Sequence, residues 1–297
     1  MLVALVVVTA VVFVIINLTP GDPVVFMLGP AASQDQILQI RHLLGLDQPI
    51  WQRYLWWLWR TTRGDLGVSL RSQAPVLPVL LQRVPPTVEL MVGAMAVAVS
   101  IAIPVGVLSA TKRNTPIDAI SRVAALLGIS MPGFWLALIA ILIFAYYIPV
   151  LPPSGIGGLR HLALPAVTLG AALAGIVMRL TRSSVLEVLG EDYVRTGRAK
   201  GLAERTVLYR HALRNGMLPV ITIVGLQTGA LLGGTVAIET VFAWPGLGFF
   251  TYQALLQRDY PVIMGSLLLY AASYLVVNLL TDLAYLAVDP RIAYTGE

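Results

Sequence analysis

The sequence contains no cysteine and few charged residues. Of its 297 residues, 12% are charged and 57% are hydrophobic, and the mean hydropathy is +0.81. A soluble domain has about 25% charged residues, so this chain cannot cover a water-facing surface and is predicted to be an integral membrane protein. The absence of cysteine excludes disulfides, thiolate metal sites and thiol nucleophiles.

Motifs of nucleotide-binding and catalytic sites are also missing. No GxxxxGK[ST] loop is present, and neither Lys112 nor Lys200 follows a phosphate-binding turn. His42, His161 and His211 lie far apart, without a paired metal-ligand spacing, and no GxSxG is found. We therefore expect no catalytic residue, no metal and no cofactor in this chain. A polytopic membrane enzyme remains an alternative that lacks its acid or histidine cluster.

The first 21 residues carry no charge. A cleaved signal peptide is one interpretation, but the chain has no basic start and no small-residue cleavage site before Asn17. A first membrane helix fits better. Spans of about 20 apolar residues are predicted at residues 2–18, 90–111, 123–148, 162–178, 219–238 and 261–281. The third contains Met131-Pro132-Gly133, which predicts a kink or a break.

Basic residues are concentrated on one side of these six spans. Residues 179–215 hold eight of the twenty Lys and Arg residues: Arg179, Arg182, Arg195, Arg198, Lys200, Arg205, Arg210 and Arg214. Lys112, Arg113 and Arg122 share their side, whereas the opposite short loops carry only Arg160 and Arg258. The positive-inside rule predicts that the basic side and both termini are cytoplasmic. The net charge of +5 then reflects topology rather than nucleic-acid binding.

The outer loop, residues 19–87, is predicted to be structured. Ser33 or Asp35 can cap a helix with Ile37, Ile40 and Leu44 on one face, and Gly45 can end it. A second helix follows, with aromatic residues at Trp51, Tyr54, Trp56, Trp57 and Trp59. Since Trp and Tyr favour the headgroup layer, we expect this helix on the outer membrane surface, with a substrate-stacking aromatic box as the alternative.

Small and polar residues mark the inner spans. Gly225, Gly229 and Gly233, next to Gly234, predict tight helix packing, and a glycine-lined pathway is the alternative. Ala98, Ala102 and Gly106 repeat the pattern more weakly. Glu89, Arg179, Glu239 and Asp282 lie near span ends, so no mid-span carboxylate indicates an ion-coupled carrier. Gln227, Thr228, Ser273 and Asn278 are predicted either to form interhelical hydrogen bonds or to line a substrate path.

The basic segment is predicted to form a helix, a sharp turn and a second helix. Glu191 and Asp192 suit a helix start, Lys200 suits its end and Gly201 the stop after it. Residues 202–204 then begin a helix with Val207, Leu208 and His211 on one face. The segment could lie on anionic lipid or dock a cytoplasmic protein, and the residues alone leave both open.

At this point the sequence resembles a known family. Residues 193–202, followed by residues 210–215 and Leu218-Pro219, resemble the EAA loop of ABC importer permeases, in particular the dipeptide/oligopeptide/nickel branch. Similar motifs occur at residues 19–23, 64–69, 241–248, 258–261 and 289–292, so the resemblance covers nearly the whole chain. The Glu-Ala-Ala that names the loop is Arg195-Thr196-Gly197 here. The family usually begins with a basic cytoplasmic segment, so we expect a longer N-terminus than Met1.

The resemblance implies an all-α integral membrane protein of the type I ABC importer permease kind, with six transmembrane helices. Residues 1–297 would form one permease domain, with residues 19–87 as extracytoplasmic loop and residues 179–217 as cytoplasmic coupling loop. Residues implied to couple to the ATPase are Tyr193, Val194, Arg195, Thr196, Arg198, Ala199, Lys200, Gly201 and Leu202. Residues implied to support the loop are Arg210, His211, Arg214, Asn215 and Pro219.

The implied function is that of a non-enzymatic permease subunit in a prokaryotic inner membrane. Its implied partners are a second homologous permease, two cytoplasmic ATPase subunits that bind ATP and magnesium, and an extracytoplasmic substrate-binding protein. Short peptides are the expected cargo, with nickel or glutathione as alternatives. An ion-coupled secondary carrier is the alternative from another class. An exporter is disfavoured, because exporters of this type usually carry a fused ATPase.

Overall fold

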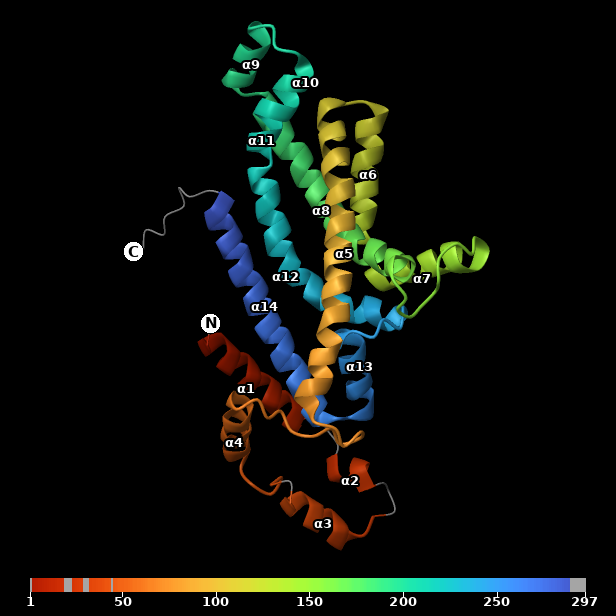
Figure 1. Cartoon of the computed structure of the whole chain (residues 1–297), viewed down its shortest axis with the longest axis vertical. Helices are drawn as coiled ribbons and strands as arrows, with labels where there is room; N and C mark the ends of the chain where they lie inside the picture. The colour runs from red at the N-terminus through yellow and green to blue at the C-terminus, as the bar shows by residue number, and fades with distance from the viewer. Residues whose placement is uncertain (1, 19–22, 29–31, 44, 289–297) are drawn as a thin grey trace. The chain divides into compact units, whose positions relative to one another are not determined.

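The computed structural model describes residues 2–18, 23–28, 32–43 and 45–288 (Figure 1). Leu44 and the motifs at residues 19–22 and 289–292 lie outside these residues. Across the described residues the fold is all-helical, as predicted, apart from one isolated β-bridge between Val68 and Pro75. The chain divides into two compact units, Met1–Thr87 with Pro245–Val276 and Val88–Trp244 with Val277–Glu297.

The helices follow one another with short connections. They are α1 (Leu2–Leu18), α2 (Pro23–Leu28), α3 (Gln34–Leu43), α4 (Ile50–Thr62), α5 (Val76–Thr111), α6 (Pro116–Ser130), α7 (Gly133–Ile141), the π-helix η1 (Leu142–Tyr147), α8 (Leu159–Leu189), α9 (Asp192–Ala199), α10 (Glu204–Thr206), the π-helix η2 (Val207–Ala212), α11 (Leu213–Gly216), α12 (Leu218–Val241), α13 (Leu247–Gln257) and α14 (Tyr260–Val288).

Four helices of the described chain are long and apolar enough to cross a membrane: Val76–Thr111, Leu159–Leu189, Leu218–Val241 and Tyr260–Thr281. The segments Pro116–Ser130 and Gly133–Tyr147 together form a fifth, broken candidate. α1 is apolar but has only 17 residues, against the roughly 20 that a bilayer requires. Four or five of the six predicted spans are thus supported by helix length, and the sixth stays a prediction.

The predicted break at Met131-Pro132-Gly133 is confirmed. The helix axis bends by 106° between α6 and the following α7–η1 segment. Met131 is extended, with ψ 131°, because the ring of a following proline disfavours the helical region. The Pro132 carbonyl then accepts hydrogen bonds from the amides of Trp135 and Leu136, at 3.0 and 3.1 Å, and so begins α7.

At two predicted span boundaries the helix extends beyond the apolar run. The second span was expected to begin at Leu90, but α5 already begins at Val76 and runs through Pro85 and Pro86. Proline removes a helical N–H donor without always ending the helix, because neighbouring groups can satisfy the freed carbonyls. The outer loop therefore includes the first turns of α5.

The fourth span was expected to end at Met178, but α8 continues to Leu189. Hydropathy falls at Arg179, yet no helix-breaking residue occurs before Gly190, where the helix ends. Helix formation depends on the backbone and not on the boundary of the apolar layer. Arg179 and Arg182 therefore lie on a helix and not in a loop.

The first unit contains the predicted helix of the outer loop. The Ser33 hydroxyl accepts the Gln36 amide (3.3 Å), and the Gln36 side-chain carbonyl accepts the Ser33 amide (3.0 Å). This reciprocal pair is a capping box, which satisfies two otherwise unpaired donors at the start of α3. Gly45 follows α3 with φ +64°, as a stop residue requires. Both expectations for this helix are confirmed.

The aromatic stretch forms α4, which packs against α1. The Tyr54 hydroxyl donates to the Val6 carbonyl (3.0 Å), and the rings of Tyr54 and Phe13 meet edge to face at 5.4 Å. Trp57 also contacts Phe13, whereas the side chains of Trp51, Leu55, Trp56 and Trp59 are exposed. α4 thus joins an apolar helix on one face and presents indoles on the other, which agrees with an interfacial helix.

Two distant motifs of the sequence meet in the first unit. The Ser69 hydroxyl donates to the buried Asp259 carboxylate, which also accepts the Leu70 amide (3.1 Å). Ser69 itself accepts the Ser72 amide and so closes a tight turn. Below it lies an apolar cluster formed by Leu66, Val76, Leu80, Leu247, Ala254, Val262 and Ile263. The contact fixes the turn after Gly67 to the start of α14.

Small residues set the helix packing in the second unit. A β-carbon added to Gly170 of α8 would lie 2.6 Å from the Ala94 carbonyl of α5, and one on Gly106 of α5 would lie 2.7 Å from Thr181 of α8. Gly175 of α8 is equally close to the Ala125 carbonyl of α6. The backbones of these three helices therefore approach closely, as small residues permit in membranes.

Candidate functional site

The first helix of the basic segment begins and ends where the sequence predicts. α9 runs from Asp192 to Ala199, with Glu191 and Lys200 as its flanking cap residues. Gly201 has φ +77°; its amide donates to the Arg198 carbonyl (2.9 Å), and the Leu202 amide donates to the Gly197 carbonyl (3.3 Å). These two bonds form a Schellman motif, which closes a helix through a left-handed residue.

The second helix returns along the first and packs on it. It begins at Glu204, after the extended residue Ala203, and continues as η2 and α11 (Figure 1). Val194 of α9 and Val207 of η2 are both fully buried, and α9 contacts η2. Leu208 and Leu213 pack against a cluster on the ends of α5 and α8, composed of Val107, Ala110 and Val185. The α9–α11 segment is therefore a compact unit anchored on two long helices.

The charged side chains of this segment point outward. Arg195, Lys200, Arg205, Arg210 and Arg214 are all exposed. Their positive charges favour contact with a negatively charged surface, of lipid or of protein.

One ion pair links the two helices of the segment. The Arg198 guanidinium forms a two-pronged contact with Glu204, with Nη2 donating to Oε1 at 2.6 Å and Nε donating to Oε2 at 3.1 Å. Hydrogen bonding to Arg198 lowers the pKa of the Glu204 carboxyl below its ordinary value, so the pair stays ionised at neutral pH. It joins the end of α9 to the start of α10 across the Gly201 turn.

A shallow pocket of about 350 Å³ opens on this segment. Tyr193 and Leu202 are 42% and 40% exposed, so two apolar side chains lie at its rim. Gly197 contributes no side chain, and an added β-carbon would lie at ordinary contact distance from Leu202, 3.6 Å. The remaining lining residues are Val194, Thr196, Lys200 and Val207.

The residues predicted to support the coupling loop differ in their contacts and exposure. The side-chain amide of Asn215 donates a hydrogen bond to the Tyr193 hydroxyl (2.9 Å) and so connects α11 to the start of α9. Pro219 lies in the first turn of α12. Arg210 and Arg214 are exposed, and the side chain of His211 lies outside the described residues. Of this set, Asn215 contacts the predicted coupling residues directly.

The predicted substrate-path residues lie on two helices. Gln227 and Thr228 are on α12, and Ser273 and Asn278 are on α14; all four side chains are half-buried. The Thr228 hydroxyl donates to the Val224 carbonyl of its own helix (2.8 Å), so it is satisfied locally. Their role in substrate passage stays a prediction.

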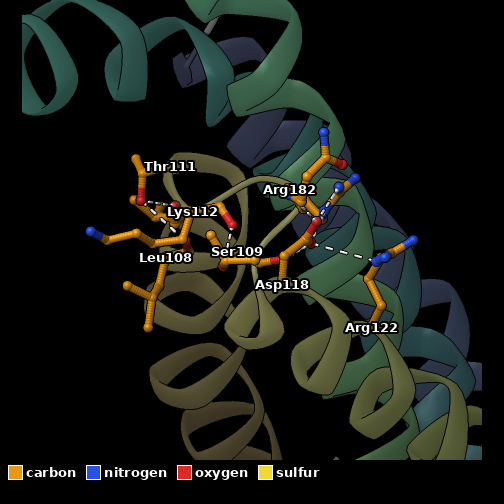
Figure 2. Close-up of polar contacts among 10 residues, drawn as sticks. Leu108, Ser109, Thr111, Lys112, Asp118, Arg122 and Arg182 are labelled. Carbon is orange, nitrogen blue, oxygen red and sulfur yellow. Dashed lines mark hydrogen bonds and ion pairs between the residues drawn. The ribbon is translucent and has the colours of Figure 1, made fainter.

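One buried polar cluster, around Asp118, was not predicted from the sequence. Asp118 on α6 is completely buried and pairs with Arg182 of α8, with Oδ1 2.7 Å from Nε (Figure 2). A signal was present, because Asp118 is the only acidic residue between Glu89 and Glu187. A lone carboxylate in 97 residues of apolar sequence between those two glutamates indicates a paired charge.

No metal centre accompanies these residues. Within the part of the chain that the structure describes, no three His, Asp or Glu side chains are placed to hold a metal ion.

Apolar helices long enough to cross a membrane, together with a compact basic segment, define a multi-span membrane protein. The family described as binding-protein-dependent transport system inner membrane component matches residues 102–294, and its N-terminal model matches residues 1–91. The chain belongs to this family, and the resemblance to ABC importer permeases is confirmed.

Curated relatives match over nearly the whole chain. The dipeptide transport system permease protein DppB of Escherichia coli (strain K12) is 42% identical, over 97% of this chain and 94% of the relative. DppB of Alkalihalophilus pseudofirmus is 41% identical, over 96% and 94%. The glutathione transport system permease protein GsiC of Escherichia coli O6:H1 is 41% identical, over 97% and 94%.

Solved structures share the fold. An inward-facing structure of the MetNI methionine ABC transporter matches with a TM-score of 0.62 at 18% identity, over 72% of this chain and 98% of that chain. An amino acid ABC transporter crystallised with histidines matches with a TM-score of 0.55 at 13% identity, over 70% and 93%. At these identities the likeness concerns the fold alone.

Proposed function

We propose that this chain is the translocation subunit of an ATP-driven importer whose cargo is a short peptide delivered by a binding protein. Membership of the binding-protein-dependent family supports the class. Two dipeptide permeases at 41–42% identity support the cargo. Glutathione, itself a small peptide, is a second candidate because a glutathione permease is 41% identical.

The complex would contain a second permease of the same family, two cytoplasmic ATPase subunits and an extracytoplasmic binding protein. This chain would cross the inner membrane six times, with α1 as first span and the broken α6–η1 segment as third. Both termini would then be cytoplasmic, since the eleven basic residues formed by Lys112, Arg113, Arg122 and the eight of residues 179–215 favour the inner side. Residues 19–87, which include the first turns of α5, and the turns before α8 and α14 would face outward.

The α9–α11 segment would be the coupling element. The observation that carries this proposal is the geometry of α9: it is closed by the Gly201 turn, buried through Val194 and basic on its exposed side. Because α9 is packed on the rest of the segment, a displacement of α9 would move the segment as a whole instead of deforming α9 alone. The pocket between Tyr193 and Leu202 could receive one apolar side chain of the ATPase.

The proposed cycle follows from these contacts. ATP binding would draw the two ATPases together and shift α9 with them. Because η2 and α11 pack on the ends of α5 and α8, the spans would then move between inward and outward access. Nucleotide thus biases a two-state equilibrium in which the permease supplies no chemistry of its own.

Reconstitution in lipid vesicles tests the proposal. The chain would be assembled with the permease, ATPase and binding-protein products of its neighbouring genes, and uptake of a radiolabelled dipeptide would be followed. We expect uptake with ATP and magnesium inside the vesicle, and none with ADP or with a proton gradient alone. Uptake by the purified chain without ATPases, or uptake driven by protons, would overturn the class. Competition by glutathione would separate the two cargo candidates.

A further inference from the structure

Asp118 is a completely buried charge with both of its carboxylate oxygens hydrogen-bonded. Its Oδ1 atom accepts hydrogen bonds from the Ser109 hydroxyl (2.7 Å) and from the Arg182 Nε–H (2.7 Å). Its Oδ2 atom accepts hydrogen bonds from the backbone N–H of Asn114 (3.1 Å) and from an Arg182 Nη2–H (3.0 Å) (Figure 2). Arg122, one turn along α6 and 56% exposed, adds a weaker contact at 3.5 Å. Each oxygen therefore has two strong donors.

These donors come from three separate elements. Ser109 belongs to the last turn of α5, Asn114 to the α5–α6 turn and Arg182 to α8. Asn114 has φ +62°, a left-handed conformation that tightens this turn. One carboxylate thus joins the end of α5, the start of α6 and the middle of the cytoplasmic half of α8. Figure 2 shows the Asp118 and Arg182 side chains directed at one another between these helices.

The cluster lies beside the anchor of the coupling segment. Val185, one turn beyond Arg182 on α8, packs with Val107 and Ala110 of α5, and Leu208 and Leu213 of the segment pack on this group. Ala110 directly follows Ser109. The point where η2 and α11 press on the spans is therefore within one helical turn of the Asp118 bonds.

Stability alone does not explain a buried ion pair. A buried pair is costly to desolvate, and well-packed apolar residues of similar volume often stabilise as well or better. A two-pronged Arg–carboxylate contact adds geometric specificity, because its two parallel hydrogen bonds fix the relative position of the helices that it joins. The glycine contacts between α5, α6 and α8 allow a short distance between the helix backbones but form no side-chain hydrogen bond between them.

We propose that Asp118 and Arg182 form a positioning pair, which makes the α5–α6 turn move with α8 when the coupling segment moves. The proposal rests on the proposed function, since it concerns how motion of α9–α11 reaches the spans. The pair neither contacts the cargo nor binds nucleotide. Without it, the segment would still respond to the ATPase, but α6 would no longer follow.

The first experiment separates positioning from stability. The reconstituted complex would carry Asp118→Asn, Arg182→Gln or the apolar double variant Asp118→Leu/Arg182→Met. The single variants leave one buried partner unpaired and are expected to fold poorly. The double variant removes both charges and is expected to melt within about 4 °C of wild type. Its uptake per ATP hydrolysed should nevertheless fall by at least about fivefold, the lower range of site-to-site coupling.

The control is Arg122→Gln, which removes a charge from the same helix at the exposed, 3.5 Å contact. It should leave both melting temperature and uptake per ATP unchanged. If the double variant melts like wild type and also transports like wild type, the pair is only structural and the proposal fails.

A second readout does not depend on transport. Because this chain has no cysteine, nitroxide labels can be attached to the purified chain, before assembly, at Ile120→Cys on α6 and Tyr209→Cys on η2, both exposed in the structure. In the otherwise unaltered complex the distance between the labels should be the same with and without ATP. In the apolar double variant it should change with nucleotide. A nucleotide-dependent distance in the otherwise unaltered complex would overturn the inference, whereas failure of ATP-driven uptake there would overturn the proposed function instead.

Discussion

At the residue scale, Gly201 shows how one backbone conformation decides the geometry of the coupling segment. Its φ of +77° is readily adopted only by glycine, and an added β-carbon would meet no atom within 4 Å. A substitution there therefore acts through the backbone alone. Gly155, in the turn before α8, has φ +85° and equally open surroundings, so it provides a matched control far along the chain from the segment.

Gly201→Ala should cost about 1–2 kcal/mol locally, the usual penalty of a left-handed L-residue, and should reduce ATP-driven uptake. Gly201→Pro should abolish uptake, because the proline ring fixes φ near −65°. Membrane insertion should be intact in both variants. Gly155→Ala has the same local strain but should transport normally. The measurement is uptake by vesicles with matched permease content; normal uptake by Gly201→Pro would contradict the coupling role.

The Arg198–Glu204 pair should contribute little to stability. Both side chains are largely exposed, and exposed ion pairs are weak and screened by salt. The pKa of Glu204 lies below its ordinary value of 4.5, so any stabilisation is complete above pH 4.5 and is lost only as the pH falls through the lowered pKa. Glu204→Gln should therefore change the melting temperature only slightly, and equally at pH 7 and pH 5.5. A much larger difference at pH 7 than at pH 5.5 would contradict this assignment.

At the element scale, the close approach of α5 and α8 depends on glycine. Gly170→Ala would place a methyl group 2.6 Å from the Ala94 carbonyl, a contact that forces the helices apart. Overpacking of this kind costs about 1–3 kcal/mol, so the purified chain should melt at a lower temperature. Gly233 on α12 has no atom within 4 Å of an added β-carbon, and Gly233→Ala should be neutral or slightly stabilising in the same assay. Equal melting of the two variants would contradict the packing.

Elements set by local chemistry could be predicted from the sequence, and contacts set by tertiary packing could not. A helix cap at Ser33 or Asp35, a kink or break at Met131-Pro132-Gly133 and a stop at Gly201 each depend on residues within one turn, and all three could be predicted. The ends of α5 and α8 could not, because hydropathy marks the apolar layer and a helix extends beyond it. Asp118 and Arg182 are 64 residues apart, and no local pattern connects them.

At the scale of the whole molecule, sequence motifs could be recognised without their contacts being foreseen. The motifs at residues 64–69 and 258–261 were identified separately, and the hydrogen bond from Ser69 to Asp259 joins them across 190 residues. Such a contact depends on how the first unit closes around its apolar cluster. The same applies to the coupling segment. Local sequence determines its helices, but its packing on α5 and α8 depends on tertiary contacts.

The six-span topology is the prediction on which orientation of the whole chain depends. With alternating spans, α3 and the turn before α8 face outward, whereas the α5–α6 turn and the α9–α11 segment face the cytoplasm. The chain has no cysteine, so single cysteines can report this directly. Suitable exposed positions are Gln39 and Ser154 for the outer side and Arg113 and Arg205 for the inner side.

A membrane-impermeant maleimide should label Gln39→Cys and Ser154→Cys in spheroplasts, and Arg113→Cys and Arg205→Cys only in inverted vesicles. The charge distribution requires this result, since moving the basic turn and segment outward would reverse the positive-inside preference of eleven residues. The pair Gln39 and Arg113 does not test α1, because a chain whose first helix does not span would still orient the later helices in the same way. In that case the N-terminus would lie outside with Gln39. If α1 spans the membrane, a tag at the N-terminus should be protected from protease in spheroplasts. Its digestion there would reduce the topology to five spans.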